Sequence, residues 1–142
     1  MTRGSLTREP ETSPRWPLHS RLEFGALDTA PACARQHAKA VILEWGLAPL
    51  ADTTELLVSE LVTNAVRASA ALPSPVVGLW LISDGHSVVV HIWDGSEAMP
   101  VRQDTTADSA RGRGLLLVEA LGKDWGAYRK ANGKVVWVLI DA

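Results

Sequence analysis

The sequence feature that most constrains the fold is the stretch LLVSELVTNAVRAS at residues 56–69. It is apolar almost throughout, but before its final serine it carries five polar residues of the kinds that form hydrogen bonds, namely Ser59, Glu60, Thr63, Asn64 and Arg67. At roughly 100° per residue, these five fall within an arc of about 140° on a helix. The stretch therefore predicts a helix with one continuous polar stripe. The stripe is either an ordinary solvated face or the lining of a ligand cavity; solvated stripes are usually rich in long charged side chains, whereas short hydrogen-bonding groups dominate here.

Length and composition indicate one globular domain in a reducing compartment. The chain has 142 residues, 46% hydrophobic and 21% charged, and a chain of this size buries about two-thirds of its unfolded surface. The formal charge of −2 gives no reason to expect nucleic acid as the principal partner. Cys33 is the only cysteine, which excludes an intrachain disulfide and a cysteine-based metal cluster. Since no apolar run resembles a signal sequence or reaches bilayer length, we expect a cytoplasmic protein without a membrane partner.

The order of the expected elements is that of an α+β two-layer sandwich. Residues 1–20 lack any period and are interpreted as a flexible tail, and residues 21–142 form the domain. The six tryptophans are scattered along the chain, which favours packing roles over a shared binding platform. Strands are expected at residues 21–26, 76–83, 87–93, 125–129 and 135–140, and helices from Thr29 to Gly46, at about 51–70 and at 115–121. With the helices grouped, we expect a mostly antiparallel sheet with the helices on one face.

Two further polar clusters stand out beside the stripe. Asp94-Gly95 follows a β-type run and is either a plain turn or an acceptor for an exocyclic amine, with the glycine leaving room for a flat ring. Gly112 and Gly114 precede a helix and are flanked by Arg111 and Arg113, so they form either a flexible loop or a phosphate site. Neither a P-loop nor a dinucleotide fingerprint is present. Residues 99–110 are polar and without a period, which is typical of a lid or binding loop.

In this order along the chain, these clusters resemble the Bergerat-fold, histidine-kinase-like ATPase (GHKL) superfamily, which includes histidine kinases and type II topoisomerases. Within it, the chain looks like the small bacterial anti-sigma factor serine/threonine kinases. The matching motifs are ELVTNAVR at residues 60–67, WDGS at 93–96, GRGLLLV at 112–118 and GKVVW at 133–137. The resemblance covers residues 22–141. The chain departs from the family at Val135, where a threonine frequently follows the lysine.

The resemblance implies a role for each matching residue. Asn64 would bind the Mg²⁺ that bridges the phosphates of ATP, and Glu60, one turn earlier, would be the general base. Asp94 would accept the adenine amino group, and Gly95 would make room for the ring. The residues expected to bind phosphate are Arg67, Arg111, Gly112, Arg113, Gly114 and Leu115, and residues 99–111 would be the ATP lid.

Two functions from different classes remain open after this comparison. One is an ATP-dependent protein serine/threonine kinase that phosphorylates an anti-sigma antagonist and sequesters a sigma factor. The other is a non-catalytic regulator that holds a partner protein, with or without nucleotide. Retention of Glu60 favours the kinase, because a protein that only binds needs no base. The resemblance also allows a homodimer.

Overall fold

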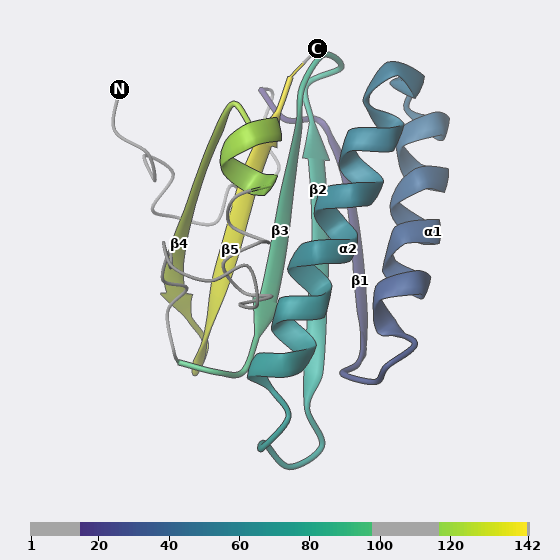
Figure 1. The fold of residues 1–142 in the computed structure, drawn as a ribbon. Coiled ribbons are helices and arrows are strands. Elements are labelled where there is room, and N and C mark those ends of the chain that lie inside the picture. The colour runs from purple at the N-terminus through teal and green to yellow at the C-terminus, as the bar shows by residue number, and fades with distance from the viewer. Residues whose placement is uncertain (1–14, 98–116, 142) are drawn as a thin grey trace.

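The computed structural model describes residues 15–97 and 117–141, which form one five-stranded sheet with helices packed on it (Figure 1). The strands lie in the order β1-β2-β3-β5-β4, and all four neighbouring pairs are antiparallel. Residues 117–121 are also helical. The elements are β1 (Leu18–Gly25), α1 (Ala30–Glu44), the short 3₁₀ helix η1 (Ala48–Leu50), α2 (Ala51–Ala68), β2 (Val76–Ser83), β3 (Val88–Asp94), β4 (Asp124–Lys130) and β5 (Gly133–Ile140).

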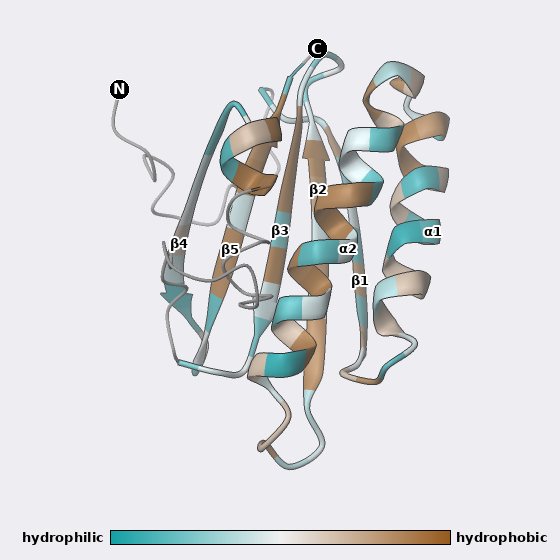
Figure 2. Cartoon of the chain, viewed as in Figure 1, coloured by the Kyte–Doolittle hydropathy of each residue, from teal (hydrophilic) through white to brown (hydrophobic). Residues whose placement is uncertain are grey.

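The helices cover one face of the sheet, so the expected α+β two-layer sandwich is confirmed (Figure 1). Helix α2 contacts β2, β3 and β5, while α1 packs against α2 and β1. The apolar colouring of the central strands and of alternate turns of α2 marks the core between the layers (Figure 2). None of the helices in the described ranges is long and apolar enough to cross a bilayer.

Helix α2 forms because its apolar residues recur at helical spacing and face the sheet. Its buried side chains include Leu57, Val58, Leu61 and Val62, each at most 4% exposed. Burial of side chains of this size stabilises the fold by about 1.5–3 kcal/mol each. The helix ends at Ala68, close to the expected end at residue 70.

The first strand begins earlier than the sequence alone indicated. Strand β1 starts at Leu18, so residues 18–20 pair with β2 although the sequence analysis placed them in the tail. Their side chains alternate between half-buried and exposed, in the same pattern as the rest of the strand. Pairing with β2 supplies backbone hydrogen bonds that no local pattern could predict.

The sheet face away from the helices carries a smaller apolar cluster. Ile82, Val89 and Trp137 are at most 1% exposed and pack there with Trp16 and Trp80. Strand pairing places Trp93 on this same face, across from a glycine of β2. Four of the six tryptophans therefore gather on one side of the sheet, although they are dispersed in the sequence.

Candidate functional site

Most of the polar stripe of α2 is neither fully buried nor fully exposed to solvent. Glu60 and Asn64 are both half-buried and lie one turn apart. The side-chain oxygen Oδ1 of Asn64 is buried, and it has no hydrogen-bond partner within the described part of the chain. A buried amide oxygen without a donor is costly, so a ligand that binds this atom would remove that cost.

The other polar residues of the stripe behave differently. The hydroxyl of Thr63 donates to the carbonyl oxygen of Ser59 at 2.7 Å, a bond within the helix itself. Arg67 is exposed in the last turn of α2. A cation at this position also stabilises the helix dipole, so its placement fits both a phosphate-facing role and a purely structural one.

Asp94 ends β3 as a buried carboxylate on the helix-covered face of the sheet. It is 2% exposed, and its Oδ1 accepts hydrogen bonds from Lys134 Nζ at 2.9 Å and from the backbone N–H of Ser96 at 2.8 Å. The pairing of β3 with β5 sets Asp94 directly opposite Lys134. The carboxylate is thus held in place from two sides.

The surroundings of Asp94 leave no room for a side chain at one glycine and little room at another. A Cβ atom on Gly133 would lie 2.0 Å from the carbonyl oxygen of Asp94. A Cβ atom on Gly95 would lie 3.3 Å from Leu72 Cδ1, which packs over this glycine. A flat ring entering beside Gly95 would therefore share its space with the Leu72 side chain.

Lys134 is a site residue to which the sequence analysis gave no role. Its side chain is 6% exposed, and a lysine that is so buried requires a partner. The sequence offered one signal for it. Lys134 directly precedes Val135, and the side chains of successive strand residues point to opposite faces of a sheet. Val135 pairs with Trp93 and therefore lies on the opposite face of the sheet from Asp94. The departure at Val135 thus leaves the helix-side surroundings of Asp94 unaltered.

The structure brings two of the three sequence clusters to the same end of the molecule. The last turn of α2 and the end of β3 lie side by side there (Figure 1), and Leu72, just past α2, contacts Gly95. The third cluster lies outside the described residues: Arg111, Gly112, Arg113, Gly114 and Leu115, together with the expected lid at residues 99–111.

The donor set near Asn64 can be compared with the needs of a metal ion. Within residues 15–97 and 117–141, no group of three or more His, Cys, Asp and Glu side chains could hold one. Mg²⁺, however, is commonly held by one or two protein oxygens together with waters and substrate phosphates. The unpartnered Oδ1 of Asn64 fits a site of that kind.

Comparison with known proteins gives a matching family and similar solved structures. Residues 25–140 match the family model described as a histidine kinase-like ATPase domain. A crystal structure of the RsbU and RsbW domains of Rv1364c from Mycobacterium tuberculosis superposes with a TM-score of 0.55 and 21% identity, over 86% of this chain and 32% of that one. Because the chain spans about a third of that protein, at low identity, this likeness concerns the fold alone. Among curated proteins, none matches the chain.

Proposed function

Because the chain belongs to the histidine kinase-like ATPase domain family, we propose that it is an ATP-binding regulator of the anti-sigma type, with protein serine/threonine kinase activity. The observation that carries the proposal is the buried Oδ1 of Asn64, which has no partner among the described residues and lies one turn from Glu60. The motifs at these residues are those through which the sequence resembles the small anti-sigma factor kinases.

The nucleotide would lie between α2 and the end of β3. Asn64 would supply an oxygen to Mg²⁺, which when bound neutralises negative charge on the phosphates. Asp94 would accept the adenine amino group. Since its Oδ1 already accepts from Lys134 and Ser96, its other oxygen, Oδ2, is the atom to which we assign this role. Arg67, at the exposed end of α2, would face the phosphates.

Glu60 would act as the general base for phosphoryl transfer. Its carboxylate would take the proton from a serine or threonine hydroxyl of a partner protein. The hydroxyl oxygen would then attack the γ-phosphorus, the bond to the β,γ-bridging oxygen would break, and ADP would leave. The partner would be an anti-sigma antagonist, and the regulator would sequester a sigma factor.

A second candidate is a regulator that binds its partner without catalysis. The ion pair between Lys134 and Asp94 favours it, because it already uses one of the two carboxylate oxygens that could recognise adenine. In that case Glu60 would be inherited from a catalytic relative and would have no role as a base. Sequestration of a sigma factor would then depend on the protein surface alone.

Titration calorimetry with ATP and Mg²⁺ tests nucleotide binding. Wild type should bind, whereas Asn64→Ala and Asp94→Asn should bind at least about tenfold more weakly, since each loses a charged or metal-linked contact. Ser59→Ala is the matched control, because Ser59 lies on the same stripe and has no assigned role. Wild-type protein that fails to bind ATP in the presence of Mg²⁺ would sink the kinase proposal.

Phosphoryl transfer from labelled ATP to a co-purified antagonist separates the two candidates. The kinase should produce phosphoserine or phosphothreonine, and Glu60→Gln should bind ATP normally but lose transfer. Binding of the antagonist or sigma factor without any labelled product in wild type would favour the non-catalytic regulator.

A further inference from the structure

Gly95, which would leave room for the base of a nucleotide, has three close neighbours in the described part of the chain. A Cβ atom added to Gly95 would lie 3.3 Å from Leu72 Cδ1 and 3.7 Å from Trp93 Cη2. Toward β5, the Cα atom of Gly95 lies 3.0 Å from the position that a Cβ atom on Gly133 would take. A group that approaches Gly95 along the direction of its absent side chain therefore meets Leu72 first.

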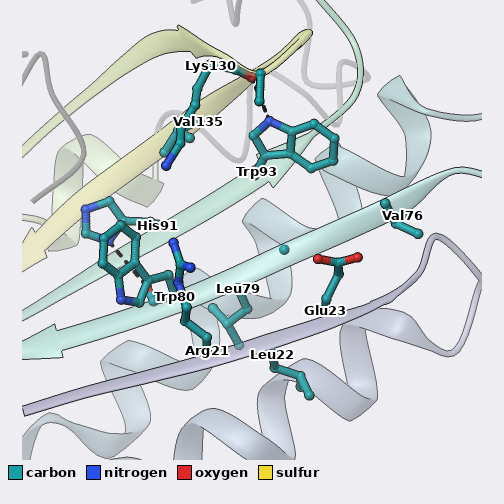
Figure 3. A pocket seen from close by; sticks show the side chains of 12 residues that line it. Arg21, Leu22, Glu23, Val76, Leu79, Trp80, His91, Trp93, Lys130 and Val135 are labelled. Atoms are coloured by element: carbon teal, nitrogen blue, oxygen red, sulfur yellow. Dashed lines mark hydrogen bonds between the residues drawn. The ribbon is translucent and has the colours of Figure 1, made fainter. Parts of the chain in front are cut away.

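Two of these three neighbours are fixed by hydrogen bonds. The indole N–H of Trp93 donates to the carbonyl oxygen of Lys130 at 2.8 Å, the bond drawn beside Trp93 in Figure 3. Gly133 is part of the sheet backbone and pairs with Lys130 of β4. Moving either neighbour would break interactions that the fold depends on, and a lost hydrogen bond is costly. Neither is therefore expected to yield to an entering ligand.

Leu72 is the neighbour that can move. Its side chain is half-buried and belongs to the loop at residues 69–75, which connects the end of α2 with the start of β2 (Figure 1). A leucine side chain has no polar atom, so its displacement breaks no side-chain hydrogen bond. Rotation between staggered wells would carry its methyl groups away from Gly95.

The backbone of this loop is held at both ends. The N–H of Leu72 donates to the carbonyl oxygen of Ser69 at 3.0 Å, and the N–H of Ser69 is bonded to carbonyl oxygens in the last turn of α2. At the other end, the carbonyl oxygen of Pro75 accepts from the N–H of Ala26 at 3.0 Å. Pro73 and Pro75 further restrict the backbone, because the proline ring fixes φ. Opening is therefore expected from the side chain of Leu72 and not from the loop as a whole.

We propose that Leu72 is a gate residue that controls access of the nucleotide base to Gly95. The inference rests on the proposed nucleotide site. In the closed arrangement, the one described here, the Leu72 side chain occupies the space beside Gly95. ATP would bind only to the open arrangement, so its apparent affinity would be lowered in proportion to the open fraction. Leu72 lies outside the motifs through which the sequence resembles its family, so this control would be a property of this chain.

Calorimetric titration of the full chain with ATP and Mg²⁺ tests the gate. Leu72→Ala removes the atoms that lie beside Gly95 and should bind about tenfold more tightly than wild type, the gain for a gate that is open in about one molecule in ten. Leu72→Phe puts a larger side chain in the same space and should bind more weakly. Leu43→Ala is the matched control, because this leucine is 47% exposed at the end of α1 and should leave binding unchanged.

The kinetics of binding separate a gate from an ordinary wall of the site. In stopped-flow measurements with a fluorescent ATP analogue, Leu72→Ala should raise the association rate about tenfold and leave the dissociation rate unchanged, because only the open fraction has changed. A gain that came from slower dissociation would overturn the gate, since it would mean a new contact with bound nucleotide.

Failure of the gate differs from failure of the nucleotide site. If wild type binds ATP and Leu72→Ala binds equally or more weakly, the gate is refuted and ATP binding stands. If neither wild type nor any variant binds ATP, both are refuted. Unchanged binding by Leu72→Phe would overturn the gate even if Leu72→Ala failed to fold, which urea unfolding of each variant would reveal.

Discussion

The ion pair between Lys134 and Asp94 makes a quantitative prediction about stability. Lys134 Nζ and Asp94 Oδ1 are 2.9 Å apart, and the two side chains are only 6% and 3% exposed. Replacing Lys134 with methionine keeps an unbranched side chain shorter by only the terminal nitrogen, but leaves a buried carboxylate without its cation. Removal of one partner from a buried pair costs about 3–5 kcal/mol, which is a large part of the 5–15 kcal/mol typical of a domain.

A surface ion pair of the same length provides the control. Lys123 Nζ lies 3.0 Å from Asp141 Oδ2, but these side chains are 58% and 33% exposed. Solvent screens an exposed pair, so Lys123→Met should cost less than about 1 kcal/mol. The difference between the two variants isolates the effect of burial from that of losing a lysine.

Urea unfolding and thermal unfolding, both followed by tryptophan fluorescence, measure the two variants. Lys134→Met should lower the melting temperature by roughly 6–20 °C, at about 2–4 °C per kcal/mol for a domain near this size. The double variant Asp94→Asn/Lys134→Met should lose less unfolding free energy than the two single variants lose together, since it buries no unpaired charge. A cost below about 1 kcal/mol for Lys134→Met, or strictly additive single changes, would refute the reasoning.

Three further predictions concern other described residues. Burial lowers the pKa of His91 to about 4, below its ordinary value of 6.5. Between these two pH values the unfolded chain binds a proton that the folded chain does not, so stability should fall as the pH drops from about 6.5 to about 4. Urea midpoints across this range should show this slope in wild type and lose it in His91→Gln. Gly133→Ala should destabilise the protein by at least about 1–3 kcal/mol through contact with Asp94, whereas Gly78→Ala should be nearly neutral in the same assay. Burial raises the pKa of Tyr128, the only tyrosine, to about 12; absorbance at 295 nm should therefore show no tyrosinate at pH 10.5, and a transition near 10 in folded protein would contradict this.

The elements that the sequence predicted best are those with strong local patterns. Strand β2 has the expected bounds, Val76–Ser83, because turn-forming residues limit it on both sides. Helix α2 was recognisable from its apolar period, and its buried side chains are those that the period selects. The beginning of β1 was not predictable in this way, since residues 18–20 are ordered by strand partners more than sixty residues later.

The candidate site shows the same division between local and distant signals. Asp94 and Asn64 could be singled out because each lies in a recognisable motif. The pairing of Asp94 with Lys134, 40 residues along the chain, depends on the sheet register and on which face each strand residue takes. The gathering of Trp80 and Trp93 around Gly78 has the same origin, because strand neighbours cannot be read from a scattered set of tryptophans.

The order of the strands also has an evolutionary consequence. Strands β3 and β5 are neighbours in the sheet, yet all of residues 95–132 come between them in the chain. A slip of one residue in this pairing would turn Lys134 to the other face of the sheet. It would also separate Gly133 from the backbone of Asp94, to which it lies so close that a Cβ atom would not fit. The register is therefore fixed by contacts that lie inside the sheet. Because the entropy of closing a loop rises by only about 0.6 kcal/mol for each doubling of its length, the connection between β3 and β5 can change in length over evolution at little cost to the pairing of these two strands.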